Sequence, residues 1–402
     1  MVSLVLAYIA AVASLARRAA KTGYHRHRRK IVIFGPDVDA GQHGSIVKSC
    51  GGRVKRALPL INAAVCVFPD EEQAMALLTR RREVKWIEDD SVFEIVRTAA
   101  PGAGTCKRCF GLKGPGFSTQ TTPWGVTRID APSVWKKATG RGIRVGVVDT
   151  GVNASHPDLA GNIKGTFNPI SGAVDAEDDN GHGTHVAGTI AALDNEFGVV
   201  GVAPEAEIYA VKSFDSKGKG MASDIIQGIA WCIGQNVKII NMSFGSADPG
   251  KALELAVSKA AEAGILLVAA SGNIGGQNTV LYPARDPRVV AVAASTQDDE
   301  IAPFSSSGPE VDITGPGTDI YSTYARQRYK TLTGTSMACP HVTGVAALVL
   351  SAVPDMRAED VKEVLCSTAT VIDGVSRDQQ GAGIVNAEAA VAFALEKTFD
   401  VW

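Results

Sequence analysis

From about residue 119 onward, short and strongly apolar runs alternate with longer segments of helical periodicity. Strands that are apolar at nearly every position are buried on both faces, which is typical of a parallel sheet between two layers of helices. We therefore predict an α/β domain with a doubly wound, mostly parallel sheet and helices on both faces. The predicted strands are 144–149, 208–213, 237–243, 265–270 and 289–294, and the predicted helices are 184–193, 223–234, 251–263, 336–353 and 358–367.

A smaller pattern precedes this domain. Residues 31–97 predict a small α+β unit, with strands at 31–34, 53–58, 63–68 and within 84–96, a turn at 88–90 and a helix at 71–79. The following stretch is rich in Gly, Pro, Ser and Thr and reads as a linker. A length of 402 residues suits two domains. The predicted boundaries are a leader at 1–30, a small domain at 31–97, a linker at 98–118 and a large domain at 119–402.

The charge is concentrated at the start of the chain. Residues 1–30 contain seven Lys and Arg and no acid; since the whole chain carries −2 and this stretch +7, the remainder carries −9. The chain as a whole therefore has no positive field that would indicate a nucleic-acid partner. Residues 1–16 are nearly all apolar, form a run short for a membrane span and contain an A-x-A-like pattern at 11–13, but the positive charge follows the run instead of preceding it. An export signal and an amphipathic or disordered leader both stay open.

The seven cysteines are too few for a dense disulfide framework, and their odd number leaves at least one thiol unpaired within the chain. Cys106 and Cys109 form a C-x-x-C in the linker, for which a local disulfide, half of a metal site and no special role are open alternatives. We expect Cys339 to have a packing role. Buried apolar positions are expected for Cys50, Cys66, Cys232 and Cys366.

Three short segments of the large domain bring together the residue types of nucleophilic catalysis. Asp149 ends an apolar strand and precedes a glycine, His182 opens a helix between two glycines, and Ser336 opens a long apolar helix. Taken alone, each has an ordinary explanation: a turn-capping Asp, a core or metal-binding pair with His185, and an N-cap Ser. Together they supply a hydroxyl, a base that titrates near neutral pH, and a carboxylate to orient that base.

These segments, in the order Asp, His, Ser, resemble the motifs of the subtilisin family of serine proteases, and the match runs from about 120 to 392. The resemblance implies a subtilisin-like fold and a serine endopeptidase that acts through an acyl-enzyme, with Asp149, His182 and Ser336 as the triad. Segment 269–273 matches the family's oxyanion motif, which implies that Asn273 donates to the oxyanion beside the Ser336 N–H.

The resemblance also implies where substrate binds. The implied residues are Gly220 on an edge strand, Ser243, Phe244 and Gly245 on one wall of the primary pocket, and Ala270 and Gly272 on the other. Two positions depart from the family pattern. Ile274 stands where several members carry an acid, which disfavours basic P1 residues, and Leu281 stands where a small residue is common, which favours medium apolar ones.

A calcium ion is implied by the same resemblance. Its ligands would be the side chains of Gln120, Asp158 and Asn195 and the carbonyls of Leu193, Phe197 and Val199. Such an all-oxygen set suits Ca²⁺. A second, weaker cation site is an open alternative around Ala284, Asp286, Val289 and Asp312.

Residues 31–97 resemble the propeptide of these proteases, which implies a small ferredoxin-like α+β domain and a zymogen whose inhibitory tail lies in the active site and is cut by Ser336. Val96 aligns best with the residue before the cut, although the linker offers other sites.

We expect the partners to be protein or peptide substrates and this propeptide, and we expect no nucleic acid among them. We also expect no stable membrane span, a monomeric state and secretion from the cell. Three alternatives are a catalytically silent peptide-binding fold, a nucleotide-binding protein and an intracellular, cytoplasmic processing protease with a narrow target. The nucleotide-binding alternative lacks the G-x-G-x-x-G pattern, and a functioning export signal would exclude the intracellular one.

Overall fold

The computed structural model describes residues 29–95 and 119–399, in two compact units. Of the described residues, the first unit comprises 29–90 together with 250–252, and the second comprises the others. Val96, Cys106, Cys109 and the predicted leader and linker lie outside the described residues, and the domain boundaries stay predictions.

The first unit is a four-stranded antiparallel sheet with two helices. Its elements follow in the order β1 (Arg29–Phe34), α2 (Ala40–Ser49), β2 (Arg53–Leu58), β3 (Ala63–Val67), α3 (Glu71–Leu78) and β4 (Val84–Asp89). The sheet order β2-β3-β1-β4 is that of a ferredoxin-like α+β fold, as predicted. Helix α2 was not predicted, and β4 runs through Asp89, so the turn predicted at 88–90 lies one to two residues later.

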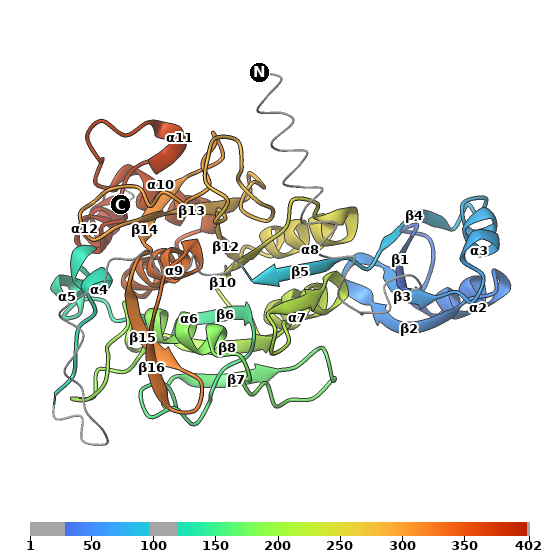
Figure 1. Cartoon of the computed structure of the whole chain (residues 1–402), viewed down its shortest axis with the longest axis horizontal. Helices are drawn as coiled ribbons and strands as arrows, with labels where there is room; N and C mark the ends of the chain where they lie inside the picture. Colours follow the sequence, from blue (N-terminus) through green and yellow to red (C-terminus); the bar gives the residue numbers. More distant parts are fainter. Residues whose placement is uncertain (1–28, 96–118, 400–402) are drawn as a thin grey trace. The chain divides into compact units, whose positions relative to one another are not determined.

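The second unit contains a seven-stranded sheet whose hydrogen-bonded pairs are all parallel, in the order β14-β13-β12-β10-β6-β8-β7. This confirms the predicted α/β class, and Figure 1 shows the helices around the sheet. The strands are β6 (Arg144–Asp149), β7 (Ile163–Phe167), β8 (Glu207–Lys212), β10 (Ile239–Met242), β12 (Leu266–Ala270), β13 (Val289–Ser295) and β14 (Ile313–Pro316). The larger helices are α6 (His182–Ala191), α7 (Ala222–Gly234), α8 (Gly250–Glu262), α9 (Thr335–Ala352), α10 (Ala358–Ser367) and α12 (Ala387–Phe399).

Alternate residues of β6 face opposite layers of helices. Val145 and Val147 belong to the core cluster that α6 and α9 complete. A side chain at Gly146 would meet Cys232 of α7, and one at Gly228 of α7 would meet Val148. Because successive strand residues point to opposite faces, α7 covers one face of the sheet, and α6 and α9 cover the other. Asp149 therefore emerges at the carboxyl end of a strand that is buried on both sides.

Helix α9 runs through the core of this unit. It is the one helix among residues 29–95 and 119–399 that is long and apolar enough to cross a membrane, but 89% of its span is buried inside the protein. The burial of α9 is that of a core helix in a globular fold.

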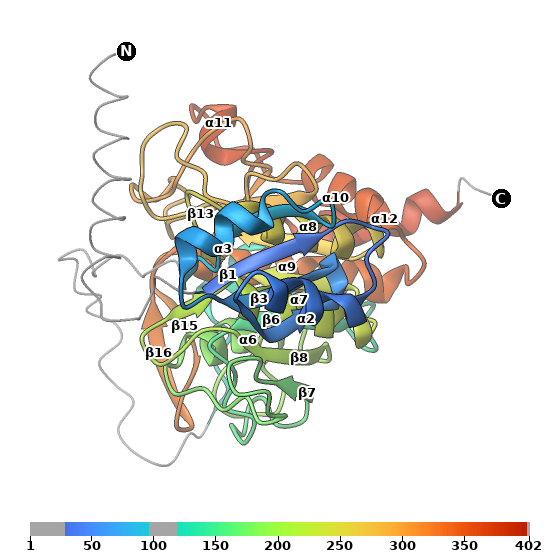
Figure 2. The same ribbon diagram turned by 90° about the vertical axis from the view of Figure 1, so that its right-hand side faces the viewer.

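The antiparallel hairpin β15 (Ile320–Tyr324) and β16 (Arg328–Leu332) packs beside α6 (Figures 1 and 2).

The described cysteines are all free. Cys50, Cys66, Cys232 and Cys339 are buried, as expected, whereas Cys366, which was also expected to be buried, is half-buried in the last turn of α10. Burial raises the pKa of the Cys66 thiol to about 12 and that of Cys366 to about 11. These two thiols are therefore neutral, like small apolar groups.

Candidate active site

Asp149 and His182 form a buried pair at the end of β6 and the start of α6. His182 Nδ1 lies 2.8 Å from Asp149 Oδ1 and 3.0 Å from Oδ2, and the Thr150 N–H also donates to Oδ1 at 2.7 Å. Burial lowers the pKa of His182, but the charge and hydrogen bonds of Asp149, aided by Asp178, raise it above its usual value. The carboxylate thus holds the Nδ1–H tautomer and leaves Nε2 to accept a proton.

Ser336 lies in the first turn of α9, as the sequence predicts. It is fully buried, and its hydroxyl donates to the Ser243 carbonyl at 3.0 Å. Among the described residues, His182 Nε2 has no hydrogen-bond partner. A hydroxyl at a helix N-terminus lies where the helix dipole favours developing negative charge.

Pro340 explains how the turn that carries Ser336 is held. Since α9 begins at Thr335, Pro340 lies inside the helix and beyond its first turn. It has no N–H for the Ser336 carbonyl. The Ser243 hydroxyl donates to that carbonyl instead, at 3.1 Å, and itself accepts from Asn241 Nδ2 at 2.9 Å. A side-chain network therefore replaces the missing helical hydrogen bond.

Cys339 belongs to the same network. Its thiol donates to Asn241 Oδ1 at 3.2 Å, and the Thr343 hydroxyl donates to the same oxygen at 3.0 Å. Burial raises the pKa of this thiol to about 12. A neutral, fully buried thiol cannot be the nucleophile near neutral pH, so the observed contacts are those of a packing residue.

Asn273 is oriented by the residue before Ser336. Its Oδ1 accepts from the Thr335 N–H at 2.9 Å and from the Thr335 hydroxyl at 2.8 Å. The amide nitrogen therefore faces away from Thr335, and a side chain at Gly334 would come within 2.9 Å of it. This geometry suits a donor to an oxyanion formed at Ser336.

The predicted substrate-binding strands flank a strand of the chain itself. β5 (Val92–Ile95) is the middle strand of a three-stranded antiparallel sheet, between β9 (Lys219–Met221) and β11 (Phe244–Gly245). Phe93 pairs with Gly220, and Ile95 pairs with Phe244. The Phe93 and Phe244 rings pack edge to face, with centroids 6.3 Å apart. Gly220, Phe244 and Gly245 thus all contact one extended segment.

Leu281 lies between the two predicted pocket walls. A Cβ at Gly245 would be 2.9 Å from the Leu281 Cβ, and one at Gly272 would be 3.0 Å from its Cγ. Ser243 and Ala270 are fully buried at the ends of the neighbouring strands, while Ile274 is 46% exposed. The leucine therefore fills space where a smaller residue would leave a deeper pocket.

The predicted calcium ligands converge around Gln120. Its Nε2 lies 2.7 Å from the Leu193 carbonyl and 3.4 Å from both Asn195 Oδ1 and the Val199 carbonyl. A half-turn of the Gln120 amide would bring its own oxygen to the same place. Asp158 accepts from Asn195 Nδ2 and from the Val199 N–H. The Phe197 N–H donates to Asn195 Oδ1 at 3.3 Å.

This donor set fits calcium. It offers carbonyl and amide oxygens with one carboxylate, the mixture that Ca²⁺ prefers. No cluster of three or more His, Cys, Asp and Glu occurs in the described part of the chain, so a site of the zinc type is not formed there. Gly198, with φ of +62°, brings the loop so close that a side chain would be 2.1 Å from Asp158 Oδ2.

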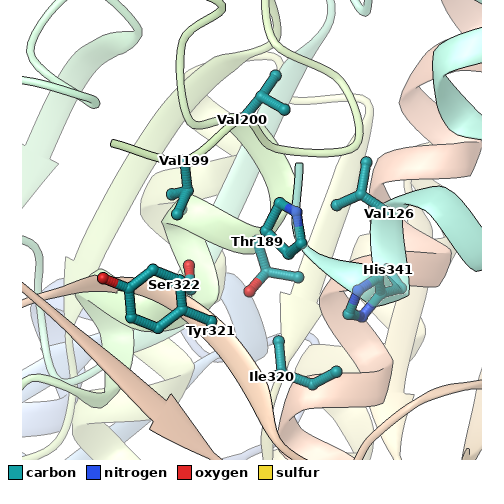
Figure 3. Close-up of a pocket in the computed structure, with 10 residues that line it drawn as sticks. Val126, Thr189, Val199, Val200, Ile320, Tyr321, Ser322 and His341 are labelled. Atoms are coloured by element: carbon teal, nitrogen blue, oxygen red, sulfur yellow. The ribbon is translucent and has the colours of Figure 1, made fainter. Parts of the chain in front are cut away.

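His341 faces a narrow apolar pocket next to this loop (Figure 3). Its Nδ1 lies 2.8 Å from the Met337 carbonyl, and burial lowers its pKa to about 4. Nε2 has no hydrogen-bond partner in the described part of the chain. The pocket is lined by Val126, Thr189, Val199 and Ile320, so a neutral imidazole fits there, and the pocket contains none of the triad.

The region of the second cation site is filled by a side chain. The Lys362 ammonium donates to Asp312 Oδ2 at 2.8 Å, the Val289 carbonyl at 3.0 Å and the Pro287 carbonyl at 3.4 Å. Asp286 is paired with Arg288 at 2.7 Å, and Ala284 is buried. The covalently attached ammonium of Lys362 thus contacts the oxygens that a bound ion would need.

Replacing Lys362 with Met should therefore create a cation-dependent protein. The Asp312 carboxylate and two carbonyls would lose a partner, at a cost of about 1–3 kcal/mol. We expect a lower Tm that added potassium or calcium salt raises more in the variant than in the parent, measured with the calcium loop saturated. Lys397→Met, at an exposed ion pair, is the control. Equal salt responses would contradict the prediction.

Comparisons with known proteins agree with this geometry. The subtilase family model matches residues 140–384. A thermostable alkaline protease of Halalkalibacterium halodurans is 50% identical over 270 residues, covering 67% of this chain and 73% of that protein. Subtilisin BL of Lederbergia lenta is 46% identical over 272 residues, covering 67% and 99%. Subtilisin E of Bacillus subtilis is 38% identical over 350 residues, covering 86% and 84%. The chain therefore belongs to the subtilase family and is a serine endopeptidase.

Proposed function

We propose that Asp149, His182 and Ser336 carry out the peptide-bond hydrolysis of this endopeptidase. His182 takes the proton of Ser336, whose oxygen attacks the peptide carbonyl, and Asn273 and the Ser336 N–H hold the oxyanion. His182 then gives its proton to the leaving amine, and water releases the acyl-enzyme. The observation that carries this proposal is the buried Asp149–His182 hydrogen bond of 2.8 Å. An intact pair also argues against a silent peptide-binding fold.

The same proposal includes a zymogen. β5 pairs on both sides with the strands expected to bind substrate, as an extended peptide substrate would. In this proposal, Val96 or a later linker residue precedes the cut. Residues 31–97 would act as an intramolecular inhibitor until this cut is made.

The pocket favours medium apolar P1 residues. Leu281 narrows the space between Gly245 and Gly272, and no acid stands at 274 to attract a basic side chain. Secretion and a monomeric state complete the proposal. They rest on the apolar start of the chain and on the resemblance to subtilisins.

Calcium would be held by Gln120, Asp158, Leu193, Asn195, Phe197 and Val199. When bound, the ion ties the segment before α6 to the loop after it, which stabilises the native state only. At a calcium concentration of about 100 times Kd, this is worth about 2.7 kcal/mol.

Removing calcium with a strong chelator should therefore lower the Tm of the processed enzyme. Asp158→Asn should show a lower Tm in calcium and little further change on chelation. Asp298→Asn, at an exposed position, is the matched control and should respond as the parent does. A Tm that chelation leaves unchanged would remove calcium from the proposal.

Intact mass over time, beside a Ser336→Ala variant, tests the proposed function. The parent in calcium should lose an N-terminal fragment and then cleave a denatured protein, while Ser336→Ala should stay whole and inactive. N-terminal sequencing locates the cut. If both proteins stay whole and neither cleaves peptides, even after another protease has removed the N-terminal region, the endopeptidase role of the triad is refuted.

A further inference from the structure

We propose that the buried Asp178 carboxylate is a positioning residue of the reaction: it holds His182 against Asp149 and offsets the positive end of α6 beside the imidazole. The inference rests on the proposed role of His182 as the base. Asp178 is 3% exposed and lies four residues before His182. It touches no reacting atom, so it would act through the backbone and hydroxyls around it.

The first turn of α6 is held by side chains from outside the helix. The first N–H groups of a helix have no partner within it. Here the His182 N–H donates to Asn180 Oδ1 at 3.1 Å, the Gly183 N–H to Thr150 Oγ1 at 2.9 Å, and the Thr184 N–H to Asp178 Oδ2 at 2.9 Å. Gly181, the residue before the helix, cannot cap it because it has no side chain. Asp178 and its neighbours supply the cap instead.

Asp178 also ties this turn to the strand that carries Asp149. Its Oδ1 accepts from the Thr150 hydroxyl at 2.8 Å and from the N–H groups of Asn180 and Gly181 at 3.0 and 2.7 Å. Thr150 directly follows Asp149, and Gly181 directly precedes His182. One carboxylate thus fixes the backbone on both sides of the Asp149–His182 hydrogen bond.

The surrounding hydrogen bonds require Asp178 to be ionised. The Thr184 hydroxyl donates to Oδ2 at 2.6 Å, because it already accepts from the Asn153 N–H at 2.9 Å. The Thr150 hydroxyl likewise accepts from Gly183 and must donate to Asp178. Burial raises the pKa of Asp178 above its usual value, and the hydrogen bonds from Thr184, Gly181 and Thr150 offset part of that rise. A protonated carboxyl would face donors only, so the charged form is the one that fits.

The negative charge of Asp178 opposes the effect of the positive end of α6 on His182. His182 is the first residue of α6, and the positive end of a helix disfavours an imidazolium there. Burial has the largest effect on the pKa of His182 and lowers it, and Asp149 has the next largest and raises it. Asp178, which lies at the same helix end, has a smaller effect and also raises this pKa. In the described part of the chain, the elements that pack against α6 also contain His185 (pKa about 3), Cys339 (pKa about 12), Lys212, which is paired with Asp179, and Lys330, which lies over the Tyr324 ring.

Asp178→Asn in the processed enzyme tests both the positioning of His182 and the effect of the Asp178 charge on it. An amide would turn a donor toward other donors, so the first turn of α6 should shift, and kcat should fall up to about 100-fold with little change in KM. Since the base must be neutral, activity is lost as pH falls through the pKa of His182. Removing the charge lowers that pKa, so the acid limb of kcat/KM should move to lower pH by about 0.5–1 unit, less than a direct charge contact gives.

Two further variants separate position from charge. Thr184→Val removes one donor and keeps the carboxylate. It should therefore lower kcat but leave unchanged the midpoint pH of the acid limb of kcat/KM. Asp175→Asn removes an exposed charge nearby and should change neither. If Asp178→Asn does not fold, an unchanged kcat in Thr184→Val is enough to refute the positioning role.

NMR titration of His182 in Ser336→Ala proteins gives a readout without activity. The pKa of His182 should be lower with Asn at 178 than with Asp. A parental kcat and midpoint in Asp178→Asn, beside an inactive Ser336→Ala, would overturn this inference alone. An active Ser336→Ala would instead overturn the proposed function.

Discussion

Replacing Asp149 with asparagine should lower kcat by about 10⁴-fold while KM changes little. The reason lies in two hydrogen bonds. The Thr150 N–H donates to Oδ1 at 2.7 Å and would hold the amide oxygen of an asparagine there. The new NH₂ group would then face His182 Nδ1 and could only donate to it. The imidazole would be driven to the Nε2–H tautomer, which cannot accept the proton of Ser336.

The measurement is kcat of the purified, processed variant on a peptide substrate, with circular dichroism to verify folding. Because the variant would not process itself, its N-terminal region is removed by another protease. Asp298→Asn, an exposed site with the same chemical change, should keep parental activity. A loss below tenfold in Asp149→Asn would mean that the tautomer of His182 is not set by this carboxylate.

The central sheet could be predicted because its strands are almost wholly apolar. β6 and α10 have the predicted ends, and β12 and β13 differ by one residue at one end. Burial on both faces leaves few polar positions, so hydrophobicity alone marks such strands. Helix α2 could not be found in this way because AGQHGSIVKS contains two glycines and few apolar residues. A capping box between Asp39 and Gln42 was the available signal.

The β15–β16 hairpin was missed for a different reason. Its second strand, RYKTL, is largely exposed and polar, so it has no clear apolar alternation. The hairpin is held by tertiary contacts with α6: the Ser322 hydroxyl donates to the His185 carbonyl, and the Thr323 hydroxyl donates to the Thr184 carbonyl. Local sequence does not contain partners that lie more than 100 residues away.

The active site likewise contains residues that a local motif reveals and residues whose role depends on the whole fold. Asp149, His182, Asn273 and Ser336 were named because each lies in a short motif, and the structure brings Asp149 and His182 into contact, although their roles stay predictions. The residues that support them carried no such signal. Asp178 is one of many acids in a loop until five donors are seen around it. Lys362 lies 50 residues from Asp312, so its position among the cation-binding oxygens depends on the whole fold.

Replacing Asn273 with alanine should lower kcat about 100- to 1000-fold, the loss known for the corresponding donor in subtilisin. KM should stay within a few-fold, because the oxyanion exists only in the transition state and the substrate strands are untouched. The alanine variant also frees the Thr335 N–H and hydroxyl, which now donate to Asn273 Oδ1, so its Tm is measured beside kcat.

Asn273→Asp separates these two effects. An aspartate keeps an acceptor for Thr335 and nearly the same shape, but it turns a carboxylate oxygen toward the place where the oxyanion forms. If Asn273 acts as a donor, the aspartate must lower kcat at least as much as alanine does, with a Tm nearer the parent's. If Asn273 serves only to hold Thr335, the aspartate should restore activity. A kcat near the parental value in Asn273→Asp would therefore leave the Ser336 N–H as the main oxyanion donor.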